Sequence, residues 1–235
     1  MKAGILAAGD GSRLAKAGIV TPKPLVKVGG LSLIERTMRA LVDAGVDEIA
    51  FIVNERMAAV AEAVAGLRLP VPIHPLVRTT PSSMHSLHEL AASLCKQRFV
   101  LCTVDTIMHS HELCAFIRHF EMHPEVDVLL SYTDFVDDEN PLRVAVDHNE
   151  RIVGIGPRAE TSPYVTLGLY GMSPSVFPVL DRAVADGVHR LRNFLGRVLD
   201  EGLTMSGRRI SKGIDVDRPE DVAVAEAFLL ENIQQ

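Results

Sequence analysis

Glycine, arginine and lysine residues near the start of the chain stand in an order that suits phosphate binding. Residues 5–30 read ILAAGDGSRLAKAGIVTPKPLVKVGG, so an apolar run is followed by Gly9 and Gly11, then by Arg13, and later by Lys23 between two prolines. Glycine lets the backbone approach a ligand closely and point N–H groups at it. Arginine and lysine beside such a turn supply positive charge for a polyphosphate. We therefore expect a phosphate site in this segment.

Two common phosphate-binding signatures do not match the segment. A dinucleotide fingerprint requires G-x-G-x-x-G, and Leu14 takes the place of the third glycine. A Walker P-loop requires G-x-x-x-x-G-K-[ST], and this spacing is absent from the segment. The phosphates must therefore be bound in another way.

A third signature does match. Residues 6–14 (LAAGDGSRL) and 22–25 (PKPL) resemble the motif L-A-A-G-x-G-x-R-[LM], followed by P-K-P-[LM], of the nucleotidyltransferases that make NDP-sugars and related activated alcohols. The resemblance implies a nucleotide site built from Leu6, Ala7, Ala8, Gly9, Gly11, Ser12 and Arg13. In that arrangement the first three residues hold the base and ribose through backbone atoms, and the glycines and the serine offer N–H groups to the phosphates. It gives the catalytic roles to Arg13, on the β- and γ-phosphates, and to Lys23, on the α-phosphate.

Two aspartates are candidates for binding a divalent metal. Asp105 follows the apolar run at residues 99–104, and it matches the strand-terminal metal ligand of the family. Residues 213–221 (GIDVDRPED) resemble the family segment D-x-x-[TR]-P-E-[DE]-[LV], in which Asp215 matches the second ligand and Asp217 is the alternative. Magnesium prefers one or two carboxylates together with phosphate oxygens. The resemblance therefore implies Mg²⁺ as the cofactor, held by Asp105 and Asp215.

The elements that must position these residues alternate between strand and helix in the first half of the chain. Apolar runs predict strands at residues 2–8, 48–53, 71–74 and 99–104, and helical patterns predict helices at 33–43, 55–65 and from Ser82 or Ser83 to 94. Ser32 and Glu35 form the pattern of a capping box. This alternation predicts a doubly wound sheet, in which ligands bind beyond the carboxyl ends of the strands.

Shorter strands follow one another in the second half. We expect strands at residues 126–133, 142–146, 152–155, 165–172 and 204–210, and helices at 175–185, 191–201 and from 219 onward. The fold expected is α/β, a doubly wound Rossmann-like mixed sheet with a small antiparallel β insertion. We expect one nucleotidyltransferase domain, 1–235, with a nucleotide-binding half (1–125), an acceptor-binding half (126–212), and a metal-ligand turn with the C-terminal helix (213–235).

Composition limits the classes of partner. The chain has 235 residues, of which 47% are hydrophobic and 23% charged, and its formal charge is −6. This balance indicates a globular protein and argues against nucleic-acid and anionic-membrane partners. No apolar run approaches the roughly 20 residues of a membrane helix. Three cysteines without metal-like spacing are typical of reduced thiols, so we expect a cytoplasmic location.

The nucleotide base is expected to meet a hydroxyl-rich segment. Residues 78–87 (RTTPSSMHSL) resemble the Asn/Ser-rich segment of the phosphocholine and inositol-phosphate cytidylyltransferases. Thr80 and Ser83 are the candidates for contacts with the base. The Gln and the glycine-rich segment that are usual in uridylyl- and thymidylyltransferases are absent. The resemblance therefore favours CTP, with UTP next.

The acceptor is expected to contact the strand at residues 165–172. Its sequence Thr166-Leu167-Gly168-Leu169-Tyr170 resembles the family strand N-[AT]-G-[IV]-Y, so that Thr166 and Gly168 are the substrate-binding candidates. Threonine replaces the usual asparagine, which leaves room for an acceptor other than a hexose 1-phosphate.

Together these features predict a magnesium-dependent nucleotidyltransferase that joins an NMP to a sugar 1-phosphate or another phosphorylated small alcohol and releases pyrophosphate. Two alternatives are a molybdopterin-type guanylyl- or cytidylyltransferase and a non-catalytic nucleotide-sugar-binding regulator. Apolar residues near the C-terminus suit either a homodimer interface or packing within the chain.

Overall fold

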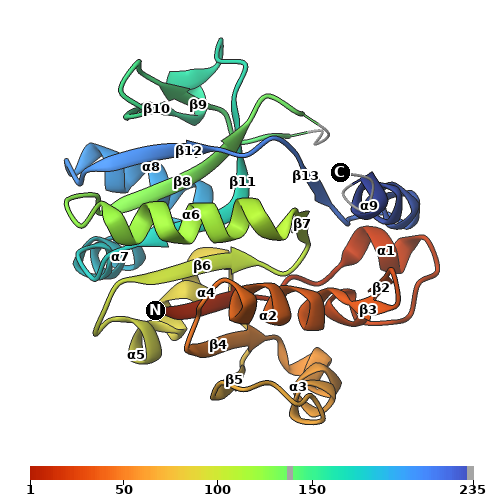
Figure 1. Ribbon diagram of the computed structural model, residues 1–235. Helices are drawn as coiled ribbons and strands as arrows, with labels where there is room; N and C mark the ends of the chain where they lie inside the picture. The colour runs from red at the N-terminus through yellow and green to blue at the C-terminus, as the bar shows by residue number, and fades with distance from the viewer. Residues whose placement is uncertain (137–139, 232–235) are drawn as a thin grey trace.

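A mixed seven-stranded β-sheet forms the centre of the protein (Figure 1). This computed structural model describes residues 1–136 and 140–231. Across the sheet the strand order is β12-β8-β11-β6-β1-β4-β5. Only β11 in this sheet runs antiparallel to its neighbours, β6 and β8. The α/β fold with a mixed sheet, expected from the sequence, is therefore confirmed.

The strands of the sheet are mostly apolar and buried on both faces, as expected for a sheet that helices cover on two sides. In chain order they are β1 (Lys2–Leu6), β4 (Glu48–Val53), β5 (Ile73–Val77), β6 (Phe99–Thr103), β8 (Val128–Thr133), β11 (Val165–Met172) and β12 (Met205–Arg209). Three short antiparallel pairs accompany the sheet: β2 (Lys27–Val28) with β3 (Leu31–Ser32), β7 (Thr106–Met108) with β13 (Gly213–Asp215), and β9 (Val144–Val146) with β10 (Ile152–Ile155).

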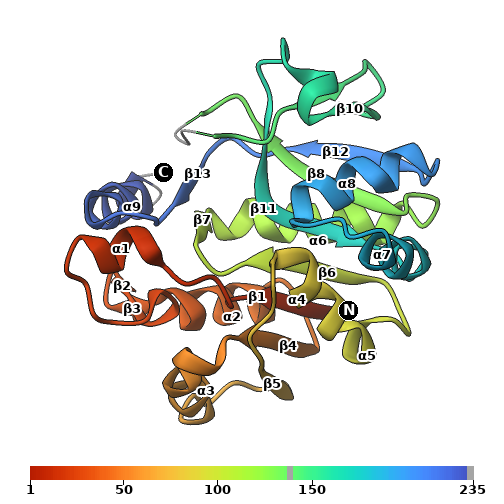
Figure 2. The ribbon, with the colours of Figure 1, turned by 180° about the vertical axis from the view of Figure 1, so that it is seen from behind.

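Helices cover both faces of the sheet. One hydrophobic core joins the sheet to α2 (Leu33–Asp43), α3 (Ala58–Ala65), α6 (Ser110–Met122) and α9 (Pro219–Glu231). A second core on the opposite face joins it to α4 (Ser83–Glu89), α5 (Ala91–Leu94), α7 (Val176–Ala185) and α8 (Leu191–Asp200), which lie in front in Figure 2. The doubly wound arrangement is thus present. None of the described helices is both long and apolar enough to cross a bilayer.

Local sequence explains where helices begin. In α2, the buried residues Leu33, Ile34, Met38 and Leu41 recur every three to four positions, so one face of the helix is apolar. The Ser32 hydroxyl accepts a hydrogen bond from the backbone N–H of Glu35, at 3.3 Å, which confirms the serine half of the predicted capping box. The Glu35 carboxylate pairs with Arg39.

Three expectations for the elements need correction. The helix expected to end at residue 94 is broken at Leu90 into α4 and α5. Strand β5 begins at Ile73 rather than at residue 71 and includes Pro75, because an edge strand tolerates the missing N–H of proline. The separate antiparallel insertion contains only β9 and β10, since β8, β11 and β12 belong to the main sheet.

The topology brings distant segments to one edge of the sheet. From β1 the chain first adds β4 and β5 on one side, and then crosses to place β6 on the other side of β1. Leu6 and Thr103 are paired at the carboxyl ends of β1 and β6, where a doubly wound sheet binds ligands. The pairing of β7 with β13 sets Asp215 opposite Thr106 at the same edge. Figures 1 and 2 both show α9 beside α1 (Ser12–Lys16), although the two helices are far apart in sequence.

Candidate active site

A pocket of about 570 Å³ opens at the carboxyl ends of β1 and β6. It is lined by Leu6, Ala7, Ala8, Gly9, Gly11, Ser12, Arg13, Lys23, Thr80, Ser83, Asp105 and Asp217, among others. All the residues that the sequence assigned to nucleotide binding therefore lie around one cavity, together with Lys23 and one of the two expected metal ligands.

The glycine-rich turn fits tightly against the segment that carries Lys23. Gly11 has φ +57°, a left-handed conformation that favours glycine. A Cβ at this position would lie 2.9 Å from Cβ of Lys23, closer than side chains tolerate. Gly9, in contrast, has no atom within 4 Å of its added Cβ, so that its surroundings are open. The sequence therefore uses Gly11 to bring the turn and the lysine together.

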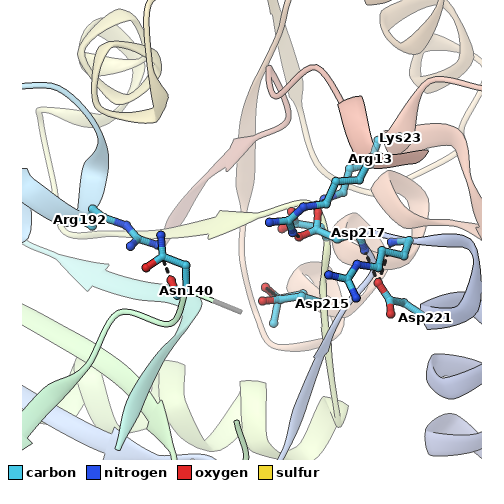
Figure 3. A network of polar contacts seen from close by, with 10 residues as sticks. Arg13, Lys23, Asn140, Arg192, Asp215, Asp217 and Asp221 are labelled. Atoms are coloured by element: carbon cyan, nitrogen blue, oxygen red, sulfur yellow. Dashed lines mark hydrogen bonds and ion pairs between the residues drawn. The ribbon is translucent and has the colours of Figure 1, made fainter. Parts of the chain in front are cut away.

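Lys23 is the electrostatic centre of the pocket (Figure 3). Its Nζ lies 2.6 Å from Oδ2 of Asp105 and 2.5 Å from Oδ1 of Asp217, and Nη1 of Arg13 lies 2.7 Å from Oδ2 of Asp217. Burial by itself lowers the pKa of Lys23, but the charges of Asp105 and Asp217 outweigh it and raise the pKa above its ordinary value. Lys23 therefore carries a positive charge although its side chain is only 7% exposed.

Asp105 depends on the same lysine for its charge. Burial raises the pKa of Asp105, yet the neighbouring charge of Lys23 outweighs this effect and holds the pKa below its usual range. The carboxylate and the ammonium group therefore stabilise one another's ionised forms at the carboxyl end of β6.

Asp215 is positioned by a pair of threonines. Its Oδ1 accepts a hydrogen bond from Oγ1 of Thr106, at 2.6 Å, and that hydroxyl lies 3.1 Å from Oγ1 of Thr103. Gly168 makes room for the pair, because a Cβ there would lie 2.0 Å and 2.6 Å from the two hydroxyl oxygens. Desolvation and the negative charge of Asp105 raise the pKa of Asp215.

The two aspartates fit a magnesium ion. Asp105 and Asp215 line the same cavity, and the negative charge of Asp105 raises the pKa of Asp215, an effect that a bound cation relieves. Within residues 1–136 and 140–231, no group of three or more His, Cys, Asp or Glu side chains forms a ligand set. The ion would therefore take its other ligands from phosphate and water, as magnesium commonly does.

The start of α9 holds the segment that carries Asp217. Pro219 and the acids that follow it occupy the first turn of the helix. Oδ2 of Asp221 accepts hydrogen bonds from the backbone N–H groups of Asp217 and Arg218, at 2.8 and 2.7 Å (Figure 3). The D-R-P-E-D sequence therefore ties the strand end to the helix as well as supplying Asp217 to the pocket.

The hydroxyl groups expected to contact the base also organise the fold. Oγ of Ser83 accepts a hydrogen bond from the N–H of Leu191, and Oγ of Ser82 accepts one from the N–H of Arg190, both at 3.1 Å. Ser82 stands at the N-cap of α4, but its side chain does not cap the helix. Thr80 lies 2.7 Å from Ser86, hydroxyl to hydroxyl.

A second pocket of about 320 Å³ adjoins the first and shares Ser83, Thr103 and Asp105 with it. It also contains both acceptor candidates, Thr166 and Gly168, and Asp215. Asp105 therefore lies where the pockets meet, and Asp215 lies in the second pocket. Sequence reasoning missed Thr103, Thr106, Arg190 and Arg192 in this region, because none of them belongs to a contiguous motif.

Comparison with known proteins identifies the family of the chain. The profile of the MobA-like NTP transferase domain matches residues 3–201. The chain belongs to this nucleotidyltransferase family. It is 31% identical, over 97% of its length, to the bifunctional IPC transferase and DIPP synthase of Rubrobacter xylanophilus. It is 28% identical, over 70% of its length, to the 2-aminoethylphosphonate cytidylyltransferase of Lancefieldella rimae.

A solved structure shares the fold. The inositol-1-phosphate CTP transferase from T. maritima superimposes with a TM-score of 0.81 at 21% identity, covering 98% of this chain and 96% of that one. The present chain spans only 52% of the Rubrobacter relative and 64% of the Lancefieldella relative. The solved structure therefore supports the fold of this chain, and the substrates in these names are those of the proteins named.

Proposed function

We propose that this protein is a magnesium-dependent cytidylyltransferase that joins CMP from CTP to a phosphorylated or phosphonylated small molecule and releases pyrophosphate. The observation that carries the proposal is the convergence of Arg13, Lys23, Asp105 and Asp217 beneath a glycine-rich turn, in one pocket beside the Asp215 pocket. Two cations in one cavity, with a second cavity adjoining it, suit a reaction between two anions.

The transfer reaction requires that the negative charges of the two reactants are neutralised and that the reacting groups are aligned. A phosphate or phosphonate oxygen of the acceptor attacks the α-phosphorus of the NTP, the new P–O bond forms, and the bond to the β-phosphate bridging oxygen breaks with release of pyrophosphate. Such reactions need little covalent participation by the protein. Magnesium, held by Asp105 and Asp215, would neutralise charge on the reacting phosphates. Lys23 would do the same at the α-phosphate, and Arg13 would bind the β- and γ-phosphates.

The backbone has a matching role in this proposal. The N–H groups of Gly9, Gly11 and Ser12 would bind the phosphates, and Leu6, Ala7 and Ala8 would contact the base and ribose. Some of these backbone groups are already hydrogen-bonded to neighbouring segments of the sheet. The N–H of Ala7 donates to the carbonyl of Ile52, and the carbonyl of Leu6 accepts from the N–H of Val104. The neighbouring Gly9 is exposed and open, and is therefore available to a ligand.

CTP is proposed as the donor, with UTP next. Thr80 and Ser83 line the nucleotide pocket, and a serine hydroxyl that accepts from Leu191 retains a proton to donate to a pyrimidine oxygen or nitrogen. The name of the Lancefieldella relative, a cytidylyltransferase, supports the same choice. The name of that relative and the name of the T. maritima inositol-1-phosphate CTP transferase also support a small phosphorylated or phosphonylated acceptor. We place that acceptor beside Thr166, with Gly168 leaving space for Thr103 and Thr106.

The domain and its setting are proposed on the same basis. Both halves, residues 1–125 and 126–212, contribute strands to one sheet, which supports a single domain completed by the segment 213–235, of which 232–235 lie outside the described residues. The cytoplasmic location and the homodimer remain predictions from the sequence. The thermal-shift screen below separates the molybdopterin-type alternative from the proposal, and the pyrophosphate-release assay described later separates the non-catalytic regulator from it.

A thermal-shift screen with CTP, UTP, GTP and ATP, each with and without Mg²⁺, tests the nucleotide site. A ligand that binds only the folded protein raises stability by RT ln(1 + [L]/Kd), so the preferred donor gives the largest rise in melting temperature. We expect CTP with Mg²⁺ to rank first. A larger shift with GTP would favour the molybdopterin-type alternative. The absence of a shift with every nucleotide would contradict the proposed function.

A further inference from the structure

Two arginines line the acceptor pocket at the start of α8. Arg190 and Arg192 both belong to the cavity of about 320 Å³ that contains Thr166, Gly168 and Asp215. Arg192 is half-buried and Arg190 is exposed. Among the ion pairs of the described residues, neither guanidinium group has a carboxylate partner.

Neighbouring arginines are neutralised by the protein itself. Arg197, on the same helix, pairs with Asp186 and Glu201 at 3.0 and 2.8 Å. Arg158 pairs with Asp200 at 2.6 Å. A guanidinium group that is partly removed from water is stabilised by an anion that accepts two parallel hydrogen bonds from it. Among the described residues, Arg190 and Arg192 therefore differ from these neighbours in having no carboxylate partner.

Hydrogen bonds hold the backbone of the segment that carries Arg190 and Arg192. The N–H of Arg190 donates to Ser82, and the N–H of Leu191 donates to Ser83, so the loop is fastened to the segment beside the nucleotide pocket. Arg190 has φ +71°, a left-handed conformation that costs a non-glycine residue free energy. Nη2 of Arg192 donates to the carbonyl of Asn140, at 3.0 Å, and Figure 3 shows this pair across the site from Asp215.

The remaining walls do not suit a positively charged ligand. Among the described residues that line this pocket, the carboxylates are Asp105 and Asp215, the two expected metal ligands. Tyr170 is its one aromatic residue, so no cage of aromatic rings is formed for an ammonium group. An amino group at the far end of the acceptor would meet two arginines, whereas an acidic group would be paired with them.

We propose that Arg190 and Arg192 bind a second anionic group of the acceptor, a carboxylate or a phosphoryl group, at the end remote from the reacting phosphate or phosphonate. The proposal rests on the proposed function in that it takes this pocket to be the acceptor site. The preferred acceptor is then a phosphate or phosphonate with a second acidic group. It differs in charge from the aminoalkyl phosphonate in the name of the Lancefieldella relative.

Four phosphonates of similar size test the charge preference: 3-phosphonopropionate, ethane-1,2-diphosphonate, 2-hydroxyethylphosphonate and 2-aminoethylphosphonate. Their binding is measured by isothermal titration calorimetry in the presence of Mg²⁺ and α,β-methylene-CTP, which cannot release pyrophosphate. One charged hydrogen-bonded contact corresponds to at least about a tenfold change in Kd. We expect at least one of the two doubly acidic compounds to bind this much more tightly than the hydroxyl compound, and the amine to bind most weakly. Whichever of the two binds more tightly identifies the anion.

Variants assign the preference to the arginines. Arg192→Gln and Arg190→Gly should each weaken binding of the preferred doubly acidic compound by about tenfold and leave the hydroxyl compound unchanged. Arg190→Gly also suits the left-handed backbone, so its melting temperature should equal or exceed that of the wild type. Arg197→Gln, the same change on the same helix but outside this pocket, is the matched control and should keep the preference. Tightest binding of the amine, equal weakening of all four compounds in the two variants, or no saturable binding of either doubly acidic compound would overturn the proposal.

Pyrophosphate release from CTP with the same compounds separates this inference from the proposed function. Binding that depends on charge and on the two arginines, but without pyrophosphate release from any NTP, would uphold the anion subsite and contradict the transfer reaction. Pyrophosphate release with 2-hydroxyethylphosphonate, but no binding of either doubly acidic compound, would uphold the transfer reaction and refute the subsite.

Discussion

Charge balance at the level of single residues centres on Lys23. One ammonium group lies between Asp105 and Asp217, and Arg13 shares Asp217 with it. The two cations are therefore held in place before any phosphate arrives, and an incoming triphosphate exchanges one set of negative partners for another. Such preorganisation lowers the cost of reorganising the site during the reaction.

Gly168 illustrates how a residue without a side chain serves the same site. Its absent Cβ leaves space for the hydroxyls of Thr103 and Thr106, and Thr106 donates to Asp215. We expect Gly168→Ala to displace these hydroxyls, to lower the free energy of unfolding by roughly 1–3 kcal/mol as overpacking does, and to weaken Mg²⁺-dependent activity. Urea unfolding and the Mg²⁺ dependence of turnover measure the two effects.

Gly196→Ala is the matched control for this substitution. Gly196 lies within α8 with no atom within 4 Å of an added Cβ, so alanine should raise the free energy of unfolding by about 0.5–1 kcal/mol and leave the Mg²⁺ dependence unchanged. An unchanged Mg²⁺ dependence in Gly168→Ala would contradict the positioning role of Gly168.

At the level of elements, α9 anchors the carboxyl edge of the sheet. Asp221 receives two backbone N–H groups that the start of the helix leaves unpaired. Asp221→Ala should therefore lower the free energy of unfolding by about 1–2 kcal/mol, the scale of a lost helix cap. Urea unfolding measures this change.

Glu220→Ala provides the comparison for Asp221. Glu220 is exposed in the same turn, whereas Asp221 is the acceptor for the backbone N–H groups of Asp217 and Arg218. Its loss should cost at most a few tenths of a kcal/mol through the helix dipole. Equal losses in the two variants would show that Asp221 has no special role.

Some of the elements could be predicted from the sequence, and others could not. Three features were predictable because the residues that determine them are adjacent in the sequence. They are the strand–turn segment at residues 5–30, the cap of α2 and the strand before Asp105. The pairing of β7 with β13 was not predicted, since strands of three residues show no periodicity and the partners are about a hundred positions apart. The contacts of Arg190 and Arg192 were missed for the same reason, because tertiary packing alone brings them to the acceptor pocket.

At the level of the whole molecule, the carboxyl and amino edges of the sheet have different roles. The carboxyl edge carries the candidate active site. Asp127 directly precedes β8, at the amino edge, and accepts hydrogen bonds from the hydroxyls of Ser173 and Ser175 and from the N–H of Thr204. These contacts join the segments next to β8, β11 and β12 away from the active site.

The pH dependence of stability follows from this amino-edge contact. Burial alone raises the pKa of Asp127, but its hydrogen bonds outweigh burial and lower the pKa. A lowered pKa means that the stabilisation is complete above the pKa of the unfolded chain, about 3.9, and is lost as the pH falls through the folded value. We expect the stability difference between the wild type and Asp127→Asn to be constant from pH 5 to 8 and to shrink below about pH 4. Urea unfolding at several pH values measures it, and a constant difference down to pH 2 would contradict the assignment.

The most direct test of the account compares Lys23→Met with Lys27→Met in pyrophosphate release from CTP and Mg²⁺. The acceptors are the four phosphonates together with glucose 1-phosphate and inositol 1-phosphate. Lys27 is an exposed lysine on β2, so its replacement controls for the loss of one charge. We predict turnover by the wild type and by Lys27→Met, and a loss of roughly 100-fold or more in Lys23→Met, the scale of a lost preorganised charge contact. Full activity in Lys23→Met, or no pyrophosphate release by the wild type with any of these acceptors, would contradict the account.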